Sequence, residues 1–97
     1  MSEAQFQKRV IKYLREKGCY VLNIPGSSQT RKGTPDVVFC APGGSFYALE
    51  LKVGKNTPSL LQLHAIEEIR KAGGNARVLY DTEWEGFKSE FEDMVNR

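Results

Sequence analysis

The strongest constraint on the fold of this chain comes from two short strand-like segments joined by a turn sequence. Residues 36–40 (DVVFC) and 45–52 (SFYALELK) are rich in aromatic and aliphatic residues, and Pro42-Gly43-Gly44 lies between them. Two such runs around a glycine-containing turn are typical of a β-hairpin. Apolar residues occur on both faces of this hairpin, so we expect helices to cover both sides.

The rest of the chain shows helix and strand signals around this hairpin. Capping boxes that begin at Ser2 and Thr82 predict the start of the first and last helices, and Thr57 followed by Pro58 predicts the start of the middle one. The expected order is helix 2–17, strands 19–24, 36–40 and 45–52, helix 58–72, strand 76–80 and a final helix. We therefore expect a single α/β domain over residues 1–97, with a small mixed sheet of about four strands in the order α-β-β-β-α-β-α.

An apolar stripe defines one face of the last helix. Trp84, Phe87, Phe91 and Met94 recur at helical spacing, although Gly86 lies among them. We expect this stripe to belong to the core, with part of it available as a dimer face.

The composition is that of an ordinary globular domain. Of the 97 residues, 40% are hydrophobic and 27% are charged. No apolar run is long enough to span a membrane and no signal-peptide pattern is present, so we expect a cytoplasmic protein without a membrane partner. Cys19, Cys40 and the single histidine, His64, are not spaced like zinc ligands.

Charge is distributed unevenly along the chain. Residues 1–32 carry seven Lys or Arg and two Glu, whereas residues 81–97 carry two Lys or Arg and six acids. The first third therefore suits contact with a polyanion such as DNA, or it is simply a solvated helix surface.

The hairpin is expected to place three charged residues on one face. With Pro42-Gly43-Gly44 as the loop, residues whose numbers sum to 86 face each other, which sets Asp36 opposite Glu50. Side chains alternate along a strand, so Lys52 shares the face of Glu50. Opposed residues have Cβ atoms roughly 5 Å apart, and two carboxylates at that separation repel each other.

Three arrangements relieve this repulsion. One carboxyl group can hold a proton, Lys52 can bridge both acids in a structural network, or a hard divalent cation can lie between them. Mg²⁺ prefers oxygen ligands and typically binds through one or two carboxylates together with phosphate oxygens. Asp36 and Glu50 are therefore candidate metal ligands, and Lys52 is placed to orient a water or to stabilise charge on a phosphate.

Gln62 and Glu3 are accessory candidates. Gln62 lies on the apolar stripe of helix 58–72, where an amide needs hydrogen-bond partners; these are either site groups or backbone atoms. Glu3 opens the first helix, where an acid either reaches a metal or simply suits the helix dipole.

Two loops supply candidate contacts to a phosphate backbone. Basic residues beside a carboxylate pair would hold DNA near the metal, and hydroxyl groups add neutral contacts. Each residue taken singly is equally well explained as exposed loop. The candidates are Arg31, Lys32, Lys55, Ser27 and Ser28.

Several motifs in order resemble a known nuclease family. Pro35-Asp36, then thirteen residues and Glu50-Leu51-Lys52, resembles the PD-(D/E)xK nuclease motif. With residues 2–7 (SEAQFQ), 31–36 (RKGTPD) and 59–62 (SLLQ), the pattern resembles the VRR-NUC domain, the virus-type replication-repair nuclease branch. The resemblance covers roughly residues 2–82.

The resemblance implies a restriction-endonuclease-like core and a phosphodiesterase that uses Mg²⁺ or Mn²⁺. Stand-alone members look like phage proteins similar to Holliday junction resolvases, which act as homodimers on branched DNA. The implied site consists of Asp36, Glu50 and the backbone carbonyl of Leu51 as metal ligands, Lys52 as the catalytic lysine, and Glu3 and Gln62 as the auxiliary acid and amide.

We therefore expect a metal-dependent DNA endonuclease that acts on branched DNA such as Holliday junctions, in the host cytoplasm if it is phage-encoded. Two other interpretations stay open. One is a catalytically silent DNA-structure-binding protein of the same fold, and the other is a small protein-interaction module whose charges are structural.

Overall fold

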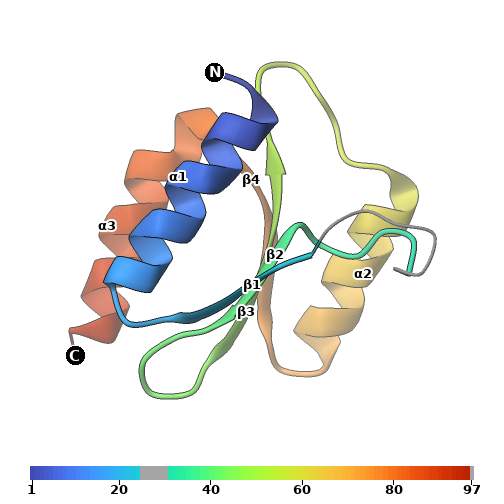
Figure 1. The fold of residues 1–97 in the computed structure, drawn as a ribbon. Coiled ribbons are helices and arrows are strands. Elements are labelled where there is room, and N and C mark those ends of the chain that lie inside the picture. The colour runs from blue at the N-terminus through green and yellow to red at the C-terminus, as the bar shows by residue number, and fades with distance from the viewer. Residues whose placement is uncertain (25–30, 97) are drawn as a thin grey trace.

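A central mixed sheet divides the molecule into three layers (Figure 1). This computed structural model describes residues 1–24 and 31–96. The four strands lie in the order β1-β2-β3-β4, with α1 and α3 on one face and α2 on the other. The predicted α/β architecture, with helices on both faces of a four-stranded sheet, is confirmed. No helix in the described parts of the chain is long and apolar enough to cross a membrane.

The elements follow the predicted order along the chain. The antiparallel pairs are β1–β2 and β2–β3, whereas β3 and β4 are parallel, so α2 forms the crossover between them. The bounds are α1 (Glu3–Glu16), β1 (Tyr20–Asn23), β2 (Val37–Cys40), β3 (Phe46–Lys52), α2 (Leu60–Lys71), β4 (Asn75–Tyr80), a 3₁₀ turn (Asp81–Glu83) and α3 (Trp84–Val95).

The β2–β3 hairpin has the predicted register. Val38 pairs with Ala48, and Cys40 pairs with Phe46. The turn is compatible with this register because Gly43 adopts a φ of +96°, in the left-handed region that glycine enters without a Cβ penalty.

One predicted pair is absent from this ladder. The β2–β3 pairing ends at Val37 and Leu49, so Asp36 lies one residue before β2 and is not a strand partner of Glu50. The carbonyl of Asp36 instead accepts a hydrogen bond from the Ile24 amide at 2.8 Å. The Asp36 carboxylate accepts a hydrogen bond from the Leu51 amide. This side-chain contact takes the place of a backbone hydrogen bond between the two strands.

Two cores of unequal size lie on the two faces of the sheet. The larger core fills the space under α1 and α3, and the smaller one, around Ala48, Ile66 and Ala76, lies under α2. The helical residues of the larger core are Phe6, Val10, Leu14, Trp84, Phe87 and Phe91. The predicted apolar face of the last helix is thus confirmed for its three aromatic residues, whereas Met94, near the C-terminal end of α3, is 45% exposed.

Two predicted helix starts are wrong. Ser59, not Thr57, caps α2, because Ser59 and Gln62 form a reciprocal capping box that satisfies two backbone amides. The last helix has no Thr82 box. A 3₁₀ turn comes first, and the Glu83 carboxylate accepts the amide of Tyr80 at 2.9 Å.

Replacing Phe91 by alanine is expected to destabilise the fold by about 3–5 kcal/mol, because a buried aromatic side chain leaves a cavity. Phe91 is 1% exposed and contacts the rings of Phe39, Tyr47 and Phe87. Urea unfolding of Phe91→Ala measures the change. Leu60→Ala is the control, because Leu60 is 85% exposed and should change stability little; equal losses in both variants would contradict the packing described here.

Candidate active site

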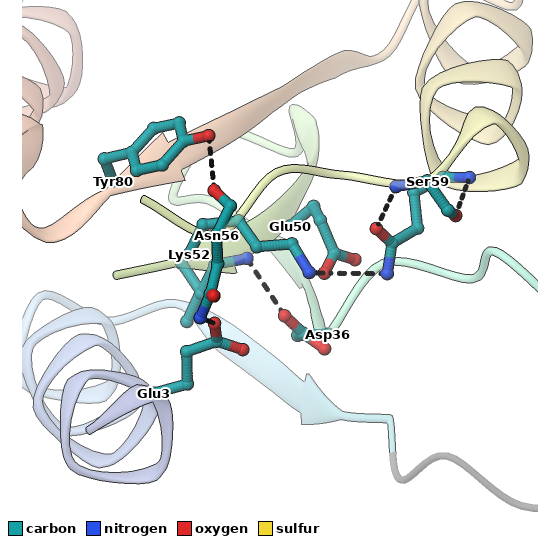
Figure 2. Close-up of polar contacts among 9 residues, drawn as sticks. Glu3, Asp36, Glu50, Lys52, Asn56, Ser59 and Tyr80 are labelled. Carbon is teal, nitrogen blue, oxygen red and sulfur yellow. Dashed lines mark hydrogen bonds and ion pairs between the residues drawn. The ribbon is translucent and has the colours of Figure 1, made fainter. Parts of the chain in front are cut away.

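The charged residues predicted from the hairpin gather at the carboxyl end of β3 (Figure 2). Leu49 and Leu51 of this strand belong to the core under α1 and α3. Because side chains alternate along a strand, Glu50 and Lys52 lie on the opposite face, the one that α2 covers in part. Alternation therefore places an acid and a lysine next to the start of α2.

Glu50 is the buried acid of the site, with 1% of its surface exposed. Its Oε2 atom lies 3.5 Å from the Lys52 ammonium nitrogen and accepts a hydrogen bond from the Gln62 amide at 3.1 Å. The other oxygen, Oε1, is buried and has no hydrogen-bond partner among the residues that the structure describes. Buried polar atoms are normally satisfied, so an unpartnered carboxylate oxygen indicates room for a further ligand.

Burial makes the charged form of Glu50 unfavourable. Burial and, after it, the nearby Asp36 carboxylate raise the pKa of Glu50 from its ordinary value of 4.5 to about 8, while Lys52 acts in the opposite direction. Burial and the Asp36 charge therefore favour the protonated form of Glu50 in the metal-free site. Protonation of one carboxyl group is the first of the three arrangements that would relieve the repulsion between Asp36 and Glu50.

Asp36 reaches the site through a side-chain contact to β3. Its Oδ2 atom accepts a hydrogen bond from the Leu51 amide at 2.9 Å. In an extended strand the N–H and C=O of one residue point to the same side, so the Leu51 carbonyl points toward the edge where Asp36 lies. The three predicted metal ligands, two carboxylates and this carbonyl, are thus grouped around one end of β3.

Gln62 connects the start of α2 to the buried carboxylate. Its Oε1 atom accepts the Ser59 amide at 2.9 Å, and its amide nitrogen donates to Glu50. The same side chain therefore caps a helix and fixes the orientation of the site acid. The sequence left open whether this side chain bonds to site groups or to backbone atoms, and it does both.

Glu3 lies apart from this group. Its Oε2 atom accepts a hydrogen bond from the Asn56 amide at 2.7 Å, and Figure 2 shows the two side chains in contact at the head of α1. No group of three or more His, Cys, Asp or Glu residues that could hold a metal ion occurs in residues 1–24 and 31–96. A role for Glu3 as an auxiliary acid stays a prediction.

The predicted DNA-contacting residues have different surroundings. Arg31 donates to the Glu68 carboxylate at 2.9 Å, and Lys32 lines a hollow of about 300 Å³ between this loop and α2. Lys55 is exposed in the loop after β3. Ser27 and Ser28 lie outside the described residues. His64 also lines the hollow. Its side chain is 67% exposed and lies beside Glu68, not at the Asp36 and Glu50 carboxylates.

The donor set fits a hard divalent cation. Two carboxylates and a carbonyl leave coordination positions for water or phosphate oxygens, as Mg²⁺ sites usually do. The buried and unpartnered Oε1 atom of Glu50 is the structural observation that supports this fit. A cation there would also remove the reason for Glu50 to keep a proton, because ligand carboxylates must be ionised.

Sequence reasoning missed two residues next to the site, Asn56 and Tyr80. The hydroxyl group of Tyr80 donates to the carbonyl oxygen of Asn56 at 2.7 Å, and Asn56 in turn holds Glu3. Neither residue belongs to a motif, and only the parallel pairing of β4 with β3 brings Tyr80 beside the loop.

Comparisons with known proteins identify similar folds. The family model of the archaeal Holliday junction resolvase (Hjc) matches residues 3–91. A solved VRR_NUC domain has a TM-score of 0.71 and 24% identity, covering 98% of this chain and 95% of that chain. The structure of Archaeoglobus fulgidus Hjc, a Holliday junction resolvase from an archaeal hyperthermophile, has a TM-score of 0.60 and 22% identity.

The Archaeoglobus comparison covers 79% of this chain, which spans 65% of that protein's length. No curated protein matches. The predicted VRR-NUC resemblance and the restriction-endonuclease-like fold class are confirmed.

Gly33 is expected to be essential for the position of Asp36. It has a φ of +84°, and a Cβ there would lie 2.5 Å from the Leu61 carbonyl oxygen. Gly33→Ala should therefore displace the loop that leads to Asp36. Gly43→Ala is the matched control, because Gly43 has a similar φ of +96° with nothing within 4 Å.

Both alanine variants should lose about 1–2 kcal/mol from the left-handed backbone alone. Gly33→Ala should lose more and should also weaken any activity or metal binding of the site. Thermal unfolding and Mn²⁺ titration measure the two effects. Equal behaviour of the two variants would show that the contact with Leu61 does not matter.

The raised pKa of Glu50 predicts a specific pH dependence of stability. Native Glu50 keeps its proton up to about pH 8, whereas the unfolded chain loses it near 4.5. The native state then binds more protons between these values, so this contribution to stability is full at low pH and is lost as pH rises through about 8. Melting temperatures in EDTA from about pH 5 to about pH 9 measure it.

Glu50→Gln should flatten this fall, because glutamine does not titrate. Glu85→Gln is the control, since the side chain of Glu85 is 85% exposed, and it should keep the wild-type slope. A wild-type protein whose stability rises over this range, or a Glu50→Gln variant with an unchanged slope, would contradict the protonated state of the site.

Proposed function

This chain belongs to the archaeal Holliday junction resolvase family, and from that premise we propose that it is a divalent-metal-dependent endonuclease that hydrolyses phosphodiester bonds of branched DNA. The main support within the structure is the buried Glu50 carboxylate, which has one unpartnered oxygen and lies beside Asp36 and Lys52. Burying an acid in this way is costly, and a purely structural role would normally satisfy both oxygens.

The proposed ligands of the cation are Asp36, Glu50 and the carbonyl of Leu51, with Mg²⁺ or Mn²⁺ as the metal. When bound, such a cation stabilises charge on a phosphate and lowers the pKa of a coordinated water. Gln62 keeps the Glu50 carboxylate in one orientation through its amide. The backbone amide of Leu51 orients Asp36, so both proposed metal-binding carboxylates are held in place before the cation binds.

Lys52 is the proposed catalytic lysine. Its side chain is only 13% exposed and its ammonium group lies 3.5 Å from Glu50. The Lys52 ammonium group, held this close to the carboxylates, would lie near a DNA phosphate bound at the proposed metal site. It would stabilise the negative charge that develops there in the transition state, and this effect is large where water is excluded.

The basic loops are the proposed DNA contacts. Arg31 and Lys32 precede Asp36, and Lys55 follows Lys52. Each of the two loops next to the site therefore carries basic residues. Ser27 and Ser28 are proposed neutral contacts of the first loop. Phosphate contacts of this kind position DNA without reading its sequence, which suits a substrate defined by its branch structure.

A homodimer is part of the proposal. Two copies would present two sites and cut two strands of a junction symmetrically, as a closed two-fold assembly allows. Sedimentation of the free protein and of its junction complex tests this point. A monomer in both states would remove the paired-cut model and leave the single-site chemistry intact.

Lys52→Ala should lower cleavage of a labelled four-way junction by about 10²–10³-fold, the usual effect of removing a group that stabilises transition-state charge. The substrates are the junction, a matched linear duplex and a single strand, each with Mg²⁺, Mn²⁺ or EDTA. Lys71→Ala is the control, since Lys71 is an exposed lysine at the far end of α2. It should cleave like the wild type.

Cleavage that needs metal, prefers the junction and is lost in Lys52→Ala is the expected result. Cleavage of all three substrates would keep the nuclease and remove the selectivity for branched DNA. Tight junction binding without cutting under any metal would instead identify a catalytically silent DNA-structure-binding protein of the same fold.

A further inference from the structure

The basic residues of α1 are a feature that the proposed site does not use. Of the seven Lys and Arg in residues 1–32, five lie in α1 or directly after it, and only Arg31 and Lys32 belong to a loop at the site. The sequence left open whether this charge forms a DNA-contact surface or a solvated helix face. The positions and partners of these residues on α1 favour a contact surface.

Three of the five residues form one row on the exposed side of α1. Lys8, Lys12 and Arg15, the basic stripe, recur at i, i+4 and i+7, which places them on one helical face opposite the buried one. All three are exposed, and they line one shallow hollow together with Ile11 and Glu16. Seven residues at about 1.5 Å each give the stripe a length of about 10 Å along the helix axis.

The basic stripe lacks the ion pairs that the other two helices have. On α2, the Arg70 guanidinium group lies 3.2 Å from the Glu67 carboxylate. On α3, the Lys88 ammonium group lies 3.0 Å from the Glu85 carboxylate. No residue of the stripe has a carboxylate partner within residues 1–24 and 31–96, although Glu16 lines the same hollow. Like charges at this spacing destabilise a helix, so a bound polyanion would relieve a repulsion that the free protein carries.

The basic stripe and the site lie on opposite faces of the sheet. Figure 1 shows α1 beside α3 on one face, whereas Glu50 and Lys52 lie on the face that α2 covers in part. The two regions meet at the head of α1, where the Glu3 side chain contacts the loop that carries Lys55. DNA that leaves the site past this loop therefore reaches α1 and its stripe.

A straight duplex does not suit both surfaces. DNA is stiff over roughly 50 nm, whereas the largest extent of the described chain is 37 Å, so a linear duplex held at the site continues in one direction. The stripe faces away from the sheet, and contact with both surfaces needs a change of direction at the edge of the molecule. A branch point supplies this change, because its arms leave it along different lines.

The charge of α3 argues against a second copy of the chain as the partner of the stripe. Three of the six acids in residues 81–97 are already engaged in ion pairs, so this segment has little free negative charge. The engaged acids are Glu83, Glu85 and Glu92. A DNA arm instead presents one phosphate charge per about 1.7 Å of its axis, or about six along the stripe.

We propose that Lys8, Lys12 and Arg15 form a second DNA-contact surface, which holds one duplex arm of a branched substrate while another arm occupies the site. This inference rests on the proposed function, because the arm belongs to the DNA that the site would cleave. The contacts are to phosphates, so they add affinity for the branch without reading its sequence. The stripe is then one source of the preference for branched over linear DNA.

The test measures binding, so it does not depend on cleavage. Lys8, Lys12 and Arg15 are changed to glutamine singly and together, because glutamine has a helix propensity close to that of Lys and Arg. Lys71→Gln is the matched control, since Lys71 is also an exposed helix lysine without a carboxylate partner in the described part of the chain. Affinities for a four-way junction and a matched linear duplex are measured by fluorescence anisotropy in EDTA at several NaCl concentrations.

The expected effect is on the salt dependence of binding. On the junction, each single variant should reduce the slope of log affinity against log salt by about 0.9, and the triple variant should reduce it by about 2–3. On the linear duplex, the triple variant should reduce the slope by no more than about 1. Lys71→Gln should leave both slopes at their wild-type values.

Lysine acetylation of the wild-type protein maps the contact directly. Lys8 and Lys12 should react more slowly in the junction complex than in the free protein or in the linear-duplex complex. Lys71 should react at the same rate in all three. This measurement uses no variant, so it is independent of any effect of a substitution on folding.

The proposal is overturned if the triple variant keeps the wild-type salt slope on the junction, or loses as much on the linear duplex as on the junction. It is also overturned if Lys8 and Lys12 become protected in the free protein as its concentration rises, because a second copy of the chain would then cover α1.

Failure of this inference and failure of the proposed function give different results. If the wild type cuts the junction while the triple variant keeps its salt slope, only the second contact surface fails. If the wild type binds the junction and cuts no DNA with any metal, the proposed function fails, and the slopes still decide the role of the stripe. A wild type that binds no DNA overturns both.

Discussion

The arrangement of the site depends on the burial of one carboxylate. Glu50 lies near the carboxyl end of β3 with almost no exposed surface, where an isolated charge would be unstable. Its surroundings reduce this instability. Lys52 supplies positive charge, Gln62 donates a hydrogen bond, and the raised pKa of Glu50 favours its protonated form. The oxygen that none of these groups satisfies is the observation that supports the proposed cation site.

Secondary structure and site chemistry share residues in this small domain. Gln62 completes the capping box of α2 and also holds Glu50, so the first turn of the helix and the orientation of the acid are coupled. Asp36 occupies the end of the β2–β3 pairing, where its side chain takes the place of a backbone partner for Leu51. A small domain has a small core, and residues that serve both the secondary structure and the site help it to accommodate a buried polar group.

Two loops flank these groups, and each is held at one residue. The loop before Asp36 packs against the backbone of Leu61 at Gly33, where no side chain fits. The loop after Lys52 is held by Asn56 between α1 and β4. The candidate site is therefore bounded by segments that a single substitution is expected to displace, although Glu50 and Lys52 themselves lie on β3.

The sequence alone determined the hairpin, its register and the face shared by Glu50 and Lys52, because turn glycines and strand alternation are local properties. It also determined the order of the elements and, through motifs, the nuclease family. The start of α2 was mispredicted, since Thr57-Pro58 is a competing local signal; in the structure, Ser59 and Gln62 form the capping box and Gln62 also contacts Glu50. The partner of Glu3 and the place of Tyr80 were decided by the tertiary structure, because parallel pairing and helix packing join residues that no local pattern connects.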